Sequence, residues 1–190
     1  MTSVEIQVAL NQLIEKTGAL QSGHFQLASG LHATRFFRCI KLLRYPLAAD
    51  IIFDALSQRF ADQAIDYVLG ANEAGSIVAF EVAKRLNVEV AIARQSKGHQ
   101  YQLIEGFAFE PDQRVLVIDD ITTTGGTAKQ LIALIETAHA QPVGVGLIAT
   151  KGLFKVDLGY PTEVLITLEG MDAFPSKNCD LCEQKVPLIL

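Results

Sequence analysis

Residues 119–127 hold the side chains whose chemistry is most readily interpreted. Asp119 and Asp120 are adjacent carboxylates, and residues 122–127 read Thr-Thr-Thr-Gly-Gly-Thr. Glycine leaves backbone N–H groups uncovered and threonine adds hydroxyl donors, so this segment suits an anion such as phosphate. The two aspartates would repel a phosphate, but their oxygens suit ribose hydroxyl groups or, through water, a divalent metal. Together these groups predict a site for a phosphorylated sugar.

The flanking residues predict the elements that hold this segment in place. Val115–Ile118 are four apolar residues in succession, typical of a strand buried on both faces. Beyond the glycines, apolar residues recur at helical spacing, namely Leu131, Ile132, Leu134, Ile135 and Ala138. Ligands of open parallel sheets bind where such strands end. The segment is not a P-loop, because no Gly-Lys-Ser/Thr follows the glycines.

Residues 115–127 resemble the signature of the type I phosphoribosyltransferases, which bind 5-phosphoribosyl-1-pyrophosphate (PRPP). The resemblance implies that Asp119 and Asp120 contact the ribose diol and the cationic ring of the transition state. It also implies Mg²⁺ bound to the substrate's pyrophosphate and ribose oxygens, with no separate metal site in the protein. The residues expected at the 5-phosphate are Thr122, Thr123, Thr124, Gly125, Gly126 and Thr127.

A second junction between a strand and a helix precedes this one in the chain. Tyr67–Leu69 predict a short strand, and a helix is expected to follow through Ile77, Phe80, Ala83 and Leu86. Taken alone, the junction predicts an ordinary turn. In the family the matching loop holds the pyrophosphate through backbone amides, so the residues implied are Ala71, Asn72, Glu73, Ala74 and Gly75.

The polar segment 94–101 follows a predicted strand, residues 88–93, and is a candidate lid. A basic segment beside two phosphate sites can exclude water and supply positive charge to a leaving pyrophosphate. In the orotate phosphoribosyltransferases a matching loop carries basic residues and a histidine. By position, Arg94 matches a pyrophosphate contact, and Lys97 and His99 match groups that neutralise or protonate the leaving group. At the position of a further lysine of that loop, this sequence has Gln95.

Residues 23–41 predict a two-stranded hairpin in which Ser29-Gly30 makes the turn and the aromatic pair Phe36-Phe37 opens the second strand. The segment resembles the N-terminal hood of orotate phosphoribosyltransferases, in which an aromatic pair meets the base. Lys151 follows a predicted strand, residues 143–150, where those enzymes carry an arginine that binds the base's carboxylate. The resemblance therefore implies base contacts for Phe36, Phe37 and Lys151. Many members carry a lysine just before the Ser-Gly turn, and this sequence has Ala28 at that position.

The C-terminal tail contains Cys179 and Cys182 in a Cys-x-x-Cys pair, which can be half of a zinc site. A structural zinc needs four ligands, and Cys39 is the only other cysteine of the sequence. A similar tail occurs in one orotate phosphoribosyltransferase subgroup, so the pair is interpreted as inherited architecture. Neither a metal site nor a disulfide framework is expected here.

Composition narrows the functional classes. The chain has 190 residues, 49% of them hydrophobic and 19% charged, as in a soluble domain with a substantial core. The formal net charge of −5 argues against binding to nucleic acid through phosphate contacts. Apolar runs fall short of a membrane span, and the first residues lack a signal-peptide pattern, so a cytoplasmic location is expected.

Strands and helices alternate through residues 64–150, which predicts an α/β fold with a doubly wound parallel sheet. Helices are also expected over residues 3–16, with a Thr2–Glu5 capping box and a stop at Gly18, and from Pro46 to about Phe60. One domain, residues 1–190, is predicted. Its core spans about residues 46–170, and a small hood comprises about residues 18–42 and the C-terminal tail.

The resemblance implies transfer of the phosphoribosyl group from PRPP to a nucleobase, with orotate as the expected base. The products would be orotidine 5′-phosphate and pyrophosphate, in pyrimidine synthesis, and a homodimer is expected. One alternative is a phosphoribosyltransferase for another purine or pyrimidine. A second is a PRPP-sensing regulator that binds nucleic acid, which the acidic balance disfavours. A third is a structural role with a decayed site, which the intact acidic pair and threonine run disfavour.

Overall fold

A six-stranded sheet in the order β5-β4-β3-β6-β7-β8 forms the centre of this computed structural model, which describes residues 2–189 except 28, 97 and 99. The strands are β3 (Tyr67–Ala71), β4 (Glu89–Gln95), β5 (Tyr101–Leu103), β6 (Arg114–Thr122), β7 (Gln141–Lys151) and β8 (Thr162–Leu168). Five strands are parallel and edge strand β5 is antiparallel to β4. The doubly wound parallel sheet is therefore confirmed, with an antiparallel edge that was not predicted.

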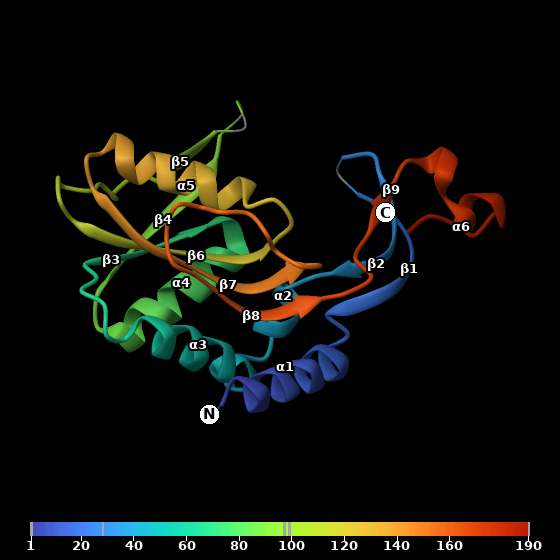
Figure 1. The fold of residues 1–190 in the computed structure, drawn as a ribbon, viewed down its shortest axis with the longest axis horizontal. Helices are drawn as coiled ribbons and strands as arrows, with labels where there is room; N and C mark the ends of the chain where they lie inside the picture. Colours follow the sequence, from blue (N-terminus) through green and yellow to red (C-terminus); the bar gives the residue numbers. More distant parts are fainter. Residues whose placement is uncertain (1, 28, 97, 99, 190) are drawn as a thin grey trace.

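Helices cover both faces of this sheet (Figure 1). The helices are α1 (Ser3–Thr17), α2 (Ile40–Leu43), α3 (Pro46–Phe60), α4 (Asn72–Leu86) and α5 (Gly126–Thr137). Leu116 and Ile118 of β6 pack into the core beneath α1–α4, whereas Val115 and Val117 pack against α5 on the other face. This alternation explains the uninterrupted apolar run, because a strand covered on both sides needs apolar residues at every position.

Helix α1 begins and ends where its sequence predicts. The Thr2 hydroxyl accepts a hydrogen bond from the Glu5 amide, and the Glu5 carboxylate accepts one from the Thr2 amide. Gly18 ends the helix in the left-handed region at φ 59°, which glycine adopts readily. The expected helix at residues 46–60 is likewise confirmed, with proline in its first turn.

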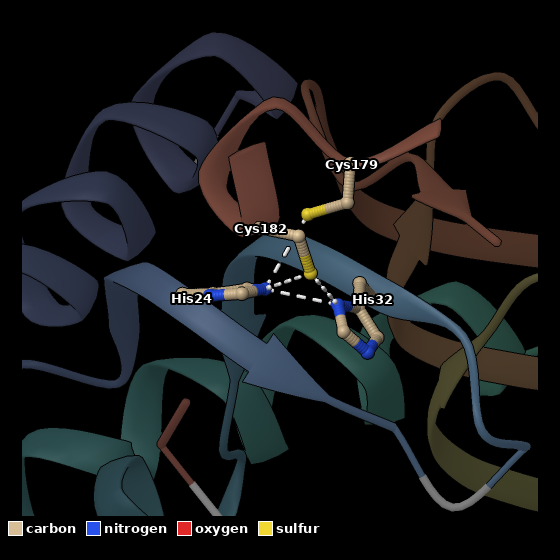
Figure 2. Close-up of side chains that lie close together, drawn as sticks. All are labelled: His24, His32, Cys179 and Cys182. Carbon is tan, nitrogen blue, oxygen red and sulfur yellow. Dashed lines mark hydrogen bonds between the residues drawn. The ribbon is translucent and has the colours of Figure 1, made fainter. Parts of the chain in front are cut away.

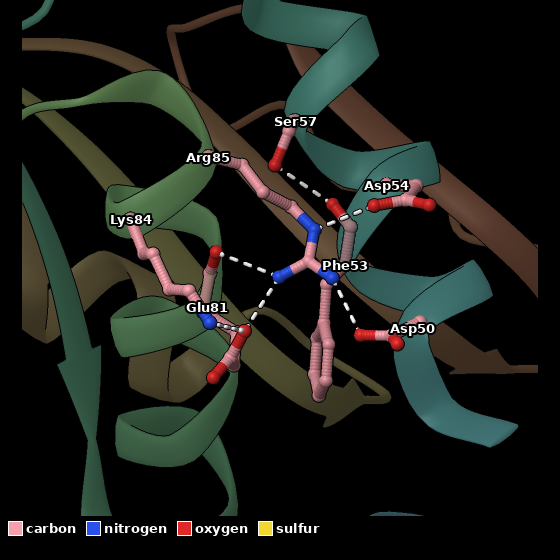
Figure 3. A network of polar contacts seen from close by, with 7 residues as sticks. All are labelled: Asp50, Phe53, Asp54, Ser57, Glu81, Lys84 and Arg85. Carbon is pink, nitrogen blue, oxygen red and sulfur yellow. Dashed lines mark hydrogen bonds and ion pairs between the residues drawn. The ribbon is translucent and has the colours of Figure 1, made fainter. Parts of the chain in front are cut away.

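An ion network joins α3 to α4 (Figure 3). The guanidinium of Arg85 lies 2.6 Å from Asp50 and 2.5 Å from Asp54 on α3, and 2.5 Å from Glu81 on its own helix. It also lies over the ring of Phe53, with the guanidinium carbon 5.2 Å from the ring centroid, within the range of about 6 Å for a cation–π contact. The planar fork of arginine can bind several carboxylates at once, so this residue connects the two helices at their polar edge.

The hood is a separate three-stranded antiparallel sheet at one end of the core (Figure 1). Its strands are β1 (Leu20–Gln26), β2 (His32–Phe37) and β9 (Ala173–Phe174), followed by the 3₁₀ turn η1 (Ser176–Asn178) and α6 (Asp180–Glu183). Strands β6, β7 and β8 run toward the hood, so their carboxyl ends face it (Figure 1). Among the described residues, no helix has the length and apolar character to cross a bilayer.

Candidate active site

Strand β6 extends further than predicted and carries the acidic pair within it. The apolar run predicted a strand ending at Ile118, but pairing with β7 continues through Thr122, which lies opposite Thr150. The amide of Asp120 donates to Asp119 Oδ1 at 3.0 Å, and the amide of Ile121 donates to Asp120 Oδ1 at 2.7 Å. The carboxylates are therefore held by the sheet backbone, which is more rigid than a loop.

Burial dominates the electrostatics of this pair. Asp119 is only 5% exposed, and burial together with repulsion from Asp120 raises its pKa to about 7. Burial also raises the pKa of Asp120, while the nearby Lys151 ammonium acts in the opposite direction. Two desolvated carboxylates side by side are stabilised by any positive charge that enters the site. The pair is thus suited to a cationic transition state or to a substrate-bound divalent ion.

The threonine–glycine turn connects β6 to α5. The Thr122 hydroxyl accepts a hydrogen bond from the Gly125 amide at 2.9 Å, and Gly125 adopts φ 72°. Helix α5 begins at Gly126, and among the described residues no side chain caps it. Its first amides are available to an anion, which the helix dipole also favours. Residues 122–127 can therefore offer amides and hydroxyls to an anion, and their assignment to a phosphate stays a prediction.

The second anion-binding segment differs from its prediction, because no loop separates the strand from the helix. Ala71 is the last residue of β3, and Asn72 starts α4 with φ 54°. Gly70 allows the close approach, since a Cβ atom there would overlap the Gly75 carbonyl. Gly75 in turn lies against Asp119, at 3.5 Å from a built Cβ to Oδ1. The structure thus brings the two segments together through neighbouring strands.

A cleft of about 750 Å³ lies between the hood and the core, a size typical of small-ligand sites. Its lining includes the predicted residues Phe36, Thr123, Thr124 and Lys151. It also includes residues that were not predicted, which are Leu27, Ser29, Leu31, Gly152, Gly170, Met171, Asp172 and Ala173. Residues 170–173 enter the site because β9 pairs with β2, and sequence pattern carries no signal for a pairing over such a distance.

Phe36 and Phe37 occupy opposite faces of β2, so only one of them faces the cleft. The ring of Phe36 packs against Phe25, with centroids 5.5 Å apart, and lines the cleft. Phe37 is 6% exposed and lies in the hydrophobic core. The prediction that both phenylalanines meet a base is therefore wrong for Phe37, because consecutive strand residues point to opposite faces.

The candidate lid is the hairpin formed by β4 and β5. Arg94 lies within β4 and is exposed, and it borders a surface hollow distinct from the cleft. Lys97 and His99, the expected catalytic groups of the lid, lie outside the described residues, as does Ala28. One contact joins the hairpin to the second anion segment, since Asn72 Nδ2 donates to the Tyr101 hydroxyl at 2.7 Å. No sequence pattern predicted this bond.

Comparison with known proteins agrees with the resemblance. The profile of the family described as "Phosphoribosyl transferase domain" matches residues 41–174. An orotate phosphoribosyltransferase of Caldicellulosiruptor bescii is 36% identical over 94% of this chain and 93% of its own, and one of Thermotoga maritima is 34% identical over 94% of each.

Solved structures show the same fold. Orotate phosphoribosyltransferase from Aeropyrum pernix superposes with a TM-score of 0.70, at 24% identity over 84% of this chain and 93% of that one. Adenine phosphoribosyltransferase from Rhodothermus marinus gives 0.68, at 23% identity over 85% and 99%. Because enzymes for different bases share this architecture, the fold alone does not determine which base is bound.

Proposed function

Because the chain belongs to the phosphoribosyltransferase family, we propose that it transfers the phosphoribosyl group of PRPP to orotate, giving orotidine 5′-phosphate and pyrophosphate. The observation that carries this proposal is a cleft lined by the threonines of the predicted phosphate turn and by Lys151, whose charge acts on Asp120 of the adjacent acidic pair. Nearly full-length kinship to orotate phosphoribosyltransferases supports orotate as the base.

The sugar half of the substrate binds at the ends of β6 and β3. The turn at residues 122–127 and the N-terminus of α5 hold the 5-phosphate through amides and hydroxyls. The pyrophosphate binds over the first turn of α4, residues 72–75, whose amides point away from the helix. Since the two segments meet at Gly75 and Asp119, the sugar lies between them, above the acidic pair.

The acidic pair acts on the reacting centre through charge. As the bond from C1 to pyrophosphate breaks, positive charge develops on the ribose ring, and Asp119 and Asp120 stabilise it in a buried site where electrostatic interactions are strong. Their oxygens are also the ligand type that Mg²⁺ prefers, directly or through water. Bound to PRPP, Mg²⁺ would neutralise part of the pyrophosphate charge. Asp119 and Asp120 would hold the ion near the ribose.

The base occupies the hood side of the cleft. Phe36 provides an aromatic face for the pyrimidine ring, and the Lys151 ammonium pairs with the orotate carboxylate. Lysine gives a point charge instead of the arginine fork, so the pairing is less directional than a bidentate one. The position of Lys151 near Asp120 places the carboxylate-binding group beside the reacting centre.

The hairpin of β4 and β5 closes over the leaving pyrophosphate in this proposal. Arg94, Lys97 and His99 supply positive charge and a proton there. In this structure Arg94 stands clear of the cleft, so the hairpin would have to close over its own site or reach that of a second chain in a cytoplasmic homodimer. The hydrogen bond from Asn72 to the Tyr101 hydroxyl links the hairpin to the pyrophosphate segment.

The test is loss of the orotate absorbance band in the presence of enzyme, Mg²⁺ and PRPP. We expect loss of the band only when all three are present, and orotidine 5′-phosphate as the product by mass spectrometry. Turnover of adenine or uracil in place of orotate would refute the assignment of the base. If no base reacts while PRPP binds by calorimetry, the proposed transfer reaction is wrong and only the sugar site stands.

A further inference from the structure

Four side chains that the reaction does not use converge in the hood (Figure 2). They are His24 of β1, His32 of β2, and Cys179 and Cys182 of the C-terminal tail, and their nitrogen and sulfur atoms all lie within 4.8 Å of one another. From this geometry we propose that the four residues bind a structural zinc ion that joins the hairpin to the tail.

The distances fit tetrahedral coordination. His24 Nε2 lies 3.3 Å from Cys179 Sγ and 3.6 Å from Cys182 Sγ, and His32 Nδ1 lies 3.3 Å from Cys182 Sγ. The two ring nitrogens are 2.9 Å apart. Around zinc, bonds of about 2.0 Å to nitrogen and about 2.3 Å to sulfur place neighbouring ligand atoms about 3.3–3.8 Å apart. Small adjustments of these side chains therefore suffice to enclose the ion.

The hydrogen bonding of His24 prepares it as a ligand. Its Nδ1 lies 2.7 Å from the Val186 carbonyl oxygen, which can only accept, so Nδ1 carries the proton and donates. The neutral ring then directs the lone pair of Nε2 into the cluster. Metal-binding histidines usually have such a bond to a carbonyl or carboxylate, because it fixes the tautomer and the ring orientation.

The ligand set selects zinc over the ions of the active site. Two thiolates and two imidazoles are soft or borderline donors, which Mg²⁺ does not favour and which structural zinc sites use. Cys179, His24 and His32 are 1%, 2% and 5% exposed, and Cys182 is half-buried, so the set is closed to further ligands. A site with four protein ligands and no open position is structural, not catalytic.

The hairpin of the hood buries few apolar side chains among its described residues. The buried residues of β1 and β2 are His24, Phe25, His32, Ala33 and Phe37, so polar ligands form much of its interior. Small units without a sufficient apolar core commonly depend on a metal. A zinc ion would fix the tail against both strands and thereby set the position of β2, which carries Phe36 in the cleft.

The test is the metal content of the full chain, produced without a metal-binding tag under reducing conditions and measured by elemental mass spectrometry. We expect zinc in stoichiometric amount, and about tenfold less or lower in Cys182→Ser and His24→Asn. Cys39→Ala and His139→Asn are matched controls that should keep the zinc, since Cys39 is buried in the core and His139 is exposed at φ 59°, a conformation that asparagine tolerates.

Cobalt provides a second measurement that needs no variant. After chelation, Co²⁺ added to the wild-type chain should give the intense visible bands of tetrahedral cobalt and a near-ultraviolet thiolate band, even if a substituted chain fails to fold. Three outcomes would overturn the proposal: no zinc or cobalt binding by the reduced wild-type chain, unchanged zinc in both ligand variants, or stoichiometric iron. A Cys179–Cys182 disulfide without metal would identify a redox pair instead. None of these readouts depends on transferase activity.

Discussion

Replacing Asp119 with asparagine should make the protein more stable and much less active. Burial and repulsion from Asp120 raise the pKa of Asp119 to about 7, whereas an aspartate in an unfolded chain titrates near ~4. A difference of about three pKa units corresponds to about 4 kcal/mol. Because Asp120 shares the repulsion, we expect Asp119→Asn to recover about 1–3 kcal/mol of unfolding free energy at pH 8.

The sign of the pH dependence follows from proton binding. Between pH ~4 and ~7 the unfolded chain has lost the proton that Asp119 retains in the folded state, so stability falls as pH rises through this window. Above pH ~7 the whole stability loss from Asp119 has occurred, and this contribution no longer changes with pH. The wild type should therefore show this decline, superimposed on the contributions of other groups, and Asp119→Asn should lack it.

Thermal unfolding followed by calorimetry at pH 5 and pH 8, without substrates, measures the effect. At about 2–4 °C per kcal/mol for a chain of this size, the unfolding midpoint of the variant should rise by about 2–12 °C at pH 8 and by about half as much or less at pH 5, where only part of the penalty has developed. Asparagine keeps an oxygen to accept the Asp120 amide, so the local backbone should persist. Orotate turnover should fall about 100-fold or more, because the carboxylate charge is lost at the reacting centre.

The exposed residue Asp62 supplies the matched control, since Asp62→Asn removes a carboxylate that is neither buried nor near the cleft. Its stability and turnover should both stay close to those of the wild type. A lower unfolding midpoint of Asp119→Asn at pH 8 would refute the stability argument, and turnover comparable to the wild type would refute a catalytic role for this carboxylate.

Three further substitutions test other parts of the structure. Lys151→Met should lower kcat/KM for orotate about 10–100-fold, mainly through KM, while the calorimetric affinity for PRPP changes much less. Lys151→Arg should restore activity. An equal loss of affinity for orotate and PRPP would contradict a base-binding role. Gly125→Ala should lower unfolding free energy by about 1–2 kcal/mol and weaken PRPP binding, because φ is 72° and the methyl group would meet Leu158; unaltered binding would argue against the turn as the phosphate site. Arg85→Met should lower the unfolding midpoint by about 2–6 °C with unchanged KM values, since it loses ion pairs that are partly exposed.

The sequence determined the elements and the sugar site because both are local. The run at 115–118 is typical of a strand covered on two faces, and the order acid, threonine, glycine and helix follows the chain without interruption. The capping residues at Thr2 and Gly18 likewise act within a few residues of each other. Contacts of short range leave a pattern in the sequence, which explains why the predictions of these elements were confirmed, whereas the binding of the sugar phosphate at residues 122–127 stays a prediction.

Two predictions differed from the structure where side-chain direction or close packing mattered more than residue type. Phe36 and Phe37 were predicted as a pair, yet adjacent strand residues face opposite sides, and the packing of the hood decided which one meets the cleft. The segment 71–75 was expected to be a loop, but Gly70 and Gly75 let β3 and α4 approach so closely that none is needed. Both outcomes depend on neighbours that a single sequence does not specify.

Only the tertiary structure showed what completes the Cys-x-x-Cys pair. The sequence shows no further cysteines to complete a site with Cys179 and Cys182, because the third cysteine, Cys39, lies in the core. His24 and His32 stand more than 140 residues away along the chain and reach the tail through the hood. The sequence thus determined the chemistry of each group. The distances between groups far apart in the chain were decided by folding, because tertiary packing, and not their spacing in the sequence, brings them within bonding range.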